Sequence, residues 1–188
     1  MPALSNQPLK FKQMETSSGL SRDQLPLTEF FLEELKDIYG AEKQIAQALP
    51  KLRKAATSQD LSMAFEDHLK VTQDQIARLE QIFEMMGQQA EAKKCDGMEG
   101  LLKEGETVIQ DTETGSSTRD VGLIISAQKV EHYEIAAYGS LRQLAKTIDK
   151  PEISRLLEQT LEEEKGTDML LSNLAETLIN QDAGTEVR

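Results

Sequence analysis

The sequence predicts an all-α fold in which four long helices form one bundle, and three observations support that class. Hydrophobic residues make up 38% of the 188 residues, aromatic residues only 4% and charged residues 29%. This balance is typical of long amphipathic helices rather than of a β-sandwich. Four segments place apolar residues at alternating steps of three and four, as one buried helix face requires. A connection of about thirty residues separates the second segment from the third, long enough to cross the whole bundle.

The length allows one domain with its own core, which we expect over residues 26–180. Residues 1–25 are rich in Ser, Gln, Gly and Pro without periodicity, so we expect a flexible lead-in. Residues 181–188 are expected to be a C-terminal tail. Thr28 is predicted to cap the first helix, with Pro26 just outside it.

The first two helices are predicted over residues 28–56 and 60–86. Pro50 should kink the first helix or divide its last turn, and Gly87 should stop the second. The residues that define the two stripes are Phe31, Leu35, Ile38, Ile45, Leu49, Leu52 and Ala56 in the first helix and Leu61, Phe65, Leu79, Ile82 and Met86 in the second.

The last two helices are predicted over residues 119–148 and 151–179, with Pro151 in the opening turn of the fourth. Their stripes contain Leu123, Ala127, Val130, Ala137, Leu141, Leu144 and Ile148 in the third helix and Ile153, Leu157, Leu171, Leu174 and Leu178 in the fourth.

The connections determine the topology. The first and second helices are joined by a short link, as are the third and fourth, so each pair should be an antiparallel hairpin. The long crossover contains apolar residues, among them Met98, Leu101 and Ile109, which indicate one short helix lying across the bundle. Two hairpins joined by one long crossover are the ferritin-like plan.

Polar residues interrupt each apolar stripe near its middle. Glu42 lies in line with the first stripe at its midpoint, and Glu134 lies midway along the third, with Glu131 one turn earlier. When the third helix is reflected onto the fourth, Glu164 and Asp168 fall at the height of those two glutamates. His68 interrupts the second stripe. We name Glu42, His68, Glu131, Glu134, Glu164 and Asp168 the polar belt.

The polar belt predicts a metal site because ionised carboxylates are costly in a dry core and repel one another. Either protons or a bound cation must compensate them, and no Lys or Arg lies on the central stripes at this height. One or two divalent ions are therefore expected, and carboxylate-rich ligation suits iron or manganese. The alternatives are that Glu131 or Asp168 reaches solvent and that His68 is a hydrogen-bonded core residue.

The overall charge narrows the possible partners. A formal net charge of −12 repels nucleic acid and anionic lipid and attracts cations, although a local basic patch is not excluded. The simpler explanation of the many acidic residues is that they keep the protein in solution. Cys95 is the only cysteine, which favours a reducing compartment, and neither a signal peptide nor a membrane span is visible. We therefore expect a cytoplasmic protein.

Three stretches carry a resemblance to the YciE/YciF stress-protein family: YGAEKQ at residues 39–44, CDGMEGL at 95–101 and AQKVEHYEIAAYG at 127–139. LEEEK at 161–165, with Asp168 following, is similar too. The resemblance implies a ferritin-like, rubrerythrin-like bundle, a homodimer, induction under stress in bacteria and a metal site.

One departure from that family bears on the site. After His68-Leu69 the family usually carries two glutamates, but this chain has Lys70 and Val71. The Glu-x-x-His spacing of two-metal bundles is also missing from the second and fourth helices. We therefore expect one occupied site with Glu42 reaching over and a weak or empty second position.

Two functions follow from these features. The first is a metal-binding protein that handles iron or peroxide during stress. The alternative is a structural or interaction dimer with a vestigial metal site, whose exposed face of Lys129, His132 and Tyr133 meets a partner.

Overall fold

The computed structural model describes residues 25–187, which contain helices and turns but no strand. The elements are α1 (Pro26–Ala55), α2 (Gln59–Met85), α3 (Asp96–Asp111), α4 (Ser117–Thr147), α5 (Pro151–Leu174), a single π-helical turn η2 (Ala175–Ile179) and α6 (Asn180–Thr185). The expected lead-in, residues 1–25, lies outside the described part except for Leu25.

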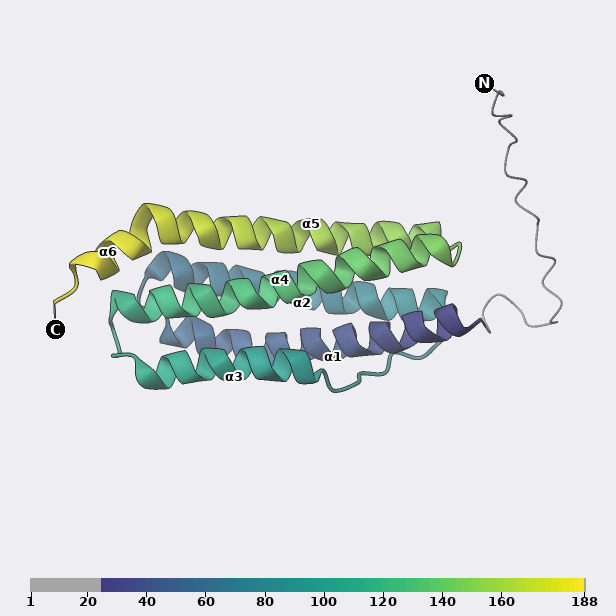
Figure 1. Ribbon diagram of the computed structural model, residues 1–188, viewed down its shortest axis with the longest axis horizontal. Coiled ribbons are helices and arrows are strands. Elements are labelled where there is room, and N and C mark those ends of the chain that lie inside the picture. The colour runs from purple at the N-terminus through teal and green to yellow at the C-terminus, as the bar shows by residue number, and fades with distance from the viewer. Residues whose placement is uncertain (1–24, 188) are drawn as a thin grey trace, which may run out of the picture.

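The four long helices form the predicted bundle of two hairpins. The α1–α2 pair and the α4–α5 pair run lengthwise side by side, and the chain passes from one pair to the other through α3 (Figure 1). The apolar stripes of these helices meet in one core, in which Phe31, Leu35, Leu79, Leu123 and Leu157 are at most 1% exposed. The ferritin-like helical fold is thus confirmed.

The crossover helix differs from the prediction in its direction. α3 does not lie across the bundle but runs lengthwise against α1 and α4 (Figure 1). Its amphipathic face, with Met98 fully buried, is long enough to pack along two helices at once. The segment before it crosses α1 so closely that a Cβ at Gly40 would clash with the Lys93 carbonyl, which explains the glycine there.

Two helix ends differ from the prediction. α1 begins one residue after Leu25, with Pro26 as its first residue, so Thr28 lies inside the helix and does not cap it. This start suits proline, whose missing N–H has no helical acceptor at that position. α1 also continues undivided through Pro50 to Ala55, so the proline does not divide its last turn.

The predicted C-terminal tail is largely helical. After the η2 turn, α6 continues to Thr185, and Glu186 then accepts hydrogen bonds from the backbone N–H groups of Ser117 (2.8 Å) and Thr118 (3.0 Å). These amides open α4, where a carboxylate is stabilised by unpaired donors and by the helix dipole. The C-terminal segment is therefore attached to the bundle.

Candidate metal centre

Four of the six belt residues come together in the middle of the bundle. His68 from α2, Glu131 and Glu134 from α4 and Glu164 from α5 each offer one ligand atom, and these atoms all lie within 4.8 Å of one another. His68 is 6% exposed, and the three glutamates are at most 1% exposed. We name these four residues the central cluster.

Glu42 adjoins the central cluster from α1. Its side chain is fully buried and accepts a hydrogen bond from the Tyr138 hydroxyl on α4. The charge of Glu42 also contributes to raising the pKa of Glu134. Glu42 lies outside the group of ligand atoms within 4.8 Å, so the cluster is centred on α2, α4 and α5.

Asp168 is not part of the central cluster. Its side chain is 24% exposed, lies 3.4 Å from the Nε2 atom of His132 and accepts a hydrogen bond from Gln128 (3.1 Å). At one turn beyond Glu164, Asp168 lies on the flank of α5, where it faces α4 at the surface. The alternative that Asp168 reaches solvent therefore holds, whereas Glu131 is buried.

A basic residue that does not belong to any central stripe lies beside the central cluster. Arg78 on α2 has a 10% exposed side chain and forms a two-pronged ion pair with Glu163, at 2.8 and 2.9 Å. It also donates to Thr160. Because Glu163 already neutralises Arg78, the guanidinium does not balance the buried carboxyls, although its charge favours the ionised form of Glu164.

Gln75 connects the surface pair to the buried cluster. Its amide nitrogen donates to Glu163 (3.2 Å) and to the buried carboxylate of Glu164. Gln75 is 1% exposed and therefore orients Glu164 from within the core.

Burial shifts the protonation of the whole cluster. Desolvation, followed by repulsion from neighbouring carboxylates, raises the pKa of Glu42 to about 8 and those of Glu131 and Glu134 well above 4.5. Desolvation likewise raises the pKa of Glu164 to about 7. Burial lowers the pKa of His68 to about 4, so its imidazole is neutral. Without a cation, burial therefore favours the protonated form of these carboxyls, and a metal would displace their protons.

The buried atoms without hydrogen-bond partners are concentrated at this cluster. Most buried polar atoms in proteins are paired, so such a group needs an explanation. The Nε2 atom of His68 lies 3.4 Å from the Oε1 atom of Glu131, but the geometry makes no hydrogen bond. The unpartnered atoms in the belt are Oε2 of Glu42, both ring nitrogens of His68, Oε2 of Glu131, both carboxyl oxygens of Glu134 and Oε2 of Glu164.

These residues fit a metal ion. Three carboxyl groups and one neutral imidazole are a donor set that binds iron or manganese, and their free lone pairs converge from three helices. Val71, half-buried one turn from Gln75, adds no ligand. Among the described residues, only this group has the spacing of a metal site.

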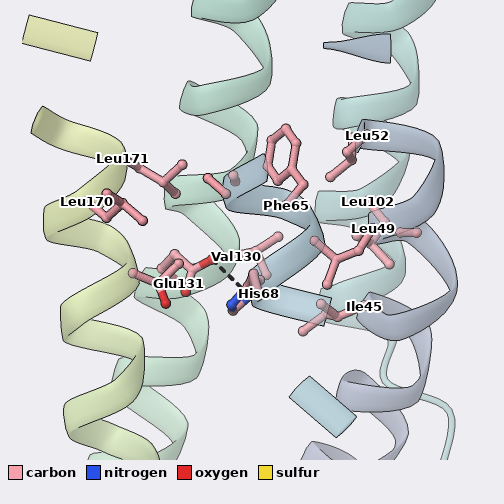
Figure 2. A pocket seen from close by; sticks show the side chains of 14 residues that line it. Ile45, Leu49, Leu52, Phe65, His68, Leu102, Val130, Glu131, Leu170 and Leu171 are labelled. Carbon is pink, nitrogen blue, oxygen red and sulfur yellow. Dashed lines mark ion pairs between the residues drawn. The ribbon is translucent and has the colours of Figure 1, made fainter. Parts of the chain in front are cut away.

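An apolar pocket that the sequence analysis did not anticipate adjoins the cluster. Its cavity volume is about 20 Å³, and His68 and Glu131 lie at its polar end (Figure 2). The other lining residues are Ile45, Ala48, Leu49, Leu52, Ala64, Phe65, Leu102, Ala127, Val130, Thr167, Leu170 and Leu171.

Comparison with known proteins places these features in a family. A family model described as "Domain of unknown function (DUF892)" matches residues 26–184. The chain is 44% identical over 158 residues to protein YciF of Escherichia coli (strain K12), covering 84% of this chain and 95% of that protein.

Two solved structures are also similar. The crystal structure of the stress protein YciF of Escherichia coli matches with a TM-score of 0.78 and 44% identity, over 82% of this chain and 98% of that one. YcfI from Rhodopseudomonas palustris, named as a candidate structural protein, matches with a TM-score of 0.75 and 40% identity, over 81% and 97%. A buried cluster of His and Glu thus lies in a fold shared with a stress protein.

Proposed function

We propose that this chain, which belongs to the DUF892 family of YciF-like proteins, is a ferritin-like metal-binding protein of the stress response. The observation that supports this function best is the central cluster, whose buried ligand atoms converge without hydrogen-bond partners. We propose iron or manganese as the ion, because carboxylates dominate the donor set.

The residues have distinct roles in this proposal. His68, Glu131, Glu134 and Glu164 would hold a single ion, and Glu42, oriented by Tyr138, would reach toward it from α1. Gln75 positions Glu164. A bound iron ion would supply one-electron chemistry toward oxygen or peroxide. The protein would keep bulk water away from it, since every one of these ligands is buried.

Replacing Glu134 with glutamine is expected to remove the metal. The wild-type protein should retain close to stoichiometric iron or manganese, whereas Glu134→Gln keeps the shape of the side chain but loses its negative charge and much of its donor strength. Metal content per chain, measured by plasma mass spectrometry, checks this result. Glu162→Gln is the matched control on α5, because Glu162 is exposed and pairs with Lys165 at the surface. Equal metal content in wild type and Glu134→Gln would contradict the site.

A second candidate function is a structural or interaction protein with a vestigial site. It is favoured by the description of YcfI and by Val71 in place of the family's glutamate. Within the expected partner face, the side chains of Lys129 and His132 are 50% and 69% exposed, whereas Tyr133 is half-buried and hydrogen-bonds with Asp37 and Cys95.

Stripping the metal with a chelator discriminates between the two functions. A bound ion at about 100 times its Kd stabilises the folded state by ~2.7 kcal/mol, which corresponds to about 5–10 °C in Tm for a chain of this size. We expect Tm to fall by that amount on chelation and to return when iron or manganese is restored. A Tm that chelation leaves unchanged would favour the structural function.

We also propose a cytoplasmic location and a homodimer. The location is supported by the single, buried, unpaired thiol of Cys95. The dimer is supported by the family resemblance alone. No helix within residues 25–187 combines the length and apolar character needed to cross a membrane.

A further inference from the structure

The apolar pocket connects the surface of the bundle with the central cluster. Its walls come from α1, α2, α3, α4 and α5, and side chains such as Leu49 and Phe65 point into it (Figure 2). Leu170 on α5 is the one exposed lining residue, at 47%, and half-buried Ala64 belongs to the neighbouring α2. The side of the pocket between α2 and α5 is thus the one with an exposed lining residue, and we call it the mouth.

The chemistry of the lining selects the occupant. Eleven of the fourteen lining residues are apolar, so an ion would lose its hydration shell without gaining partners. The acidic cluster at the inner end and the net charge of −12 repel anions in addition. An uncharged, weakly hydrated molecule meets neither obstacle, and apolar cavities in proteins bind such molecules, xenon included.

We propose that this pocket binds an uncharged diatomic molecule of the dioxygen class and brings it to the ion held by the central cluster. This inference rests on the proposed function, because it assumes an ion at the inner end. His68 and Glu131 belong to both the pocket and the central cluster, because they line the pocket and contribute ligand atoms to the cluster. A molecule at the inner end of the pocket would therefore meet the ion from the His68–Glu131 side.

Xenon tests the pocket without any metal. Crystals of the metal-free protein under xenon pressure should show an anomalous peak among Leu49, Phe65 and Leu171. Ala64→Trp, which adds bulk beside the mouth, should weaken or abolish that peak. Ala77→Trp is the matched control, because Ala77 lies on the exposed face of the same helix. An undiminished peak in Ala64→Trp, or no peak in the wild-type protein, would overturn the inference.

Nitric oxide tests whether the pocket leads to the ion. This uncharged diatomic binds ferrous iron, and the accompanying change in optical absorption lets its association rate be followed by stopped flow without turnover. The paramagnetic resonance signal of the adduct identifies it. In ferrous protein of equal iron content, Ala64→Trp should slow association several-fold, whereas Ala77→Trp should leave it unchanged. Leu170→Ala, which opens the mouth, should speed it. Equal rates in all four proteins would show that the molecule reaches the iron by another route.

The two arms separate the inference from the proposed function. If the protein retains neither iron nor manganese, the proposed function fails, and with it the delivery of a molecule to an ion, whether or not xenon occupies the pocket. If iron is bound but xenon is absent and the association rates are equal, the metal site stands and the pocket inference fails.

Discussion

Raising the pH of the metal-free protein from 6.5 to 8 is expected to lower its free energy of unfolding by about 2 kcal/mol for each belt carboxyl that stays protonated across that interval. The reason is that the folded state raises the pKa of Glu42 to about 8 and those of Glu131 and Glu134 well above 4.5. In the unfolded chain these groups titrate near 4.5. Their favourable contribution is therefore complete below 4.5 and is lost as pH rises toward the folded pKa.

His68 acts in the opposite direction over a lower range. Its pKa falls from 6.5 to about 4 on folding, so its contribution is present above 6.5 and is lost as pH falls toward 4. Between 4.5 and 6.5 it partly offsets the carboxyls, and above 6.5 it no longer does. Stability should thus fall most clearly between 6.5 and 8.

Urea unfolding at pH 5, 6.5 and 8, followed by circular dichroism in the presence of a chelator, measures this profile. The metal-loaded protein is the control. An ion replaces the protons on the carboxyls, so its stability should change far less between 6.5 and 8. A metal-free protein equally stable at 6.5 and 8 would mean that the belt carboxyls are ionised and solvated in solution.

The sequence was sufficient to predict the buried part of the belt. Glu42, Glu134 and Glu164 each lie in line with an apolar stripe, and helical periodicity places such residues in the core regardless of exact helix ends. Glu131 and Asp168 both lie on flanks, where periodicity does not decide burial. The packing of α4 against α5 buries Glu131 and leaves Asp168 partly exposed.

Other features depend on side-chain reach and on three-dimensional packing. Arg78 lies beside its stripe. Its long side chain nevertheless reaches Glu163 on α5, a residue 85 positions away in the chain. The direction of α3 depends on which bundle face it covers, and its own amphipathic pattern does not specify this. The apolar pocket arises where five helices leave space between them, so no single stripe encodes it.

Replacing Glu134 with methionine is expected to stabilise the metal-free protein at pH 8 by about 1–4 kcal/mol, by analogy with the range found when buried ion pairs are replaced by apolar residues of similar volume. Glu134 is 1% exposed and neither of its carboxyl oxygens has a hydrogen-bond partner. At pH 8 it must either hold a proton or remain ionised beside Glu42 and Glu164, and both states are unfavourable. Methionine removes that repulsion and fills the same space.

The same substitution should have the opposite effect when metal is supplied. Wild type gains stability from the ion, whereas Glu134→Met, which lacks a ligand, should gain much less, so the order of the two proteins in urea unfolding should reverse. Glu162→Met at the exposed face of α5 should leave the free energy of unfolding within about 0.5 kcal/mol of the wild-type value, with or without metal. A purely structural cluster predicts no reversal, because its glutamates would contribute equally with and without metal. The reversal therefore separates a carboxylate retained for binding an ion from one retained for the fold.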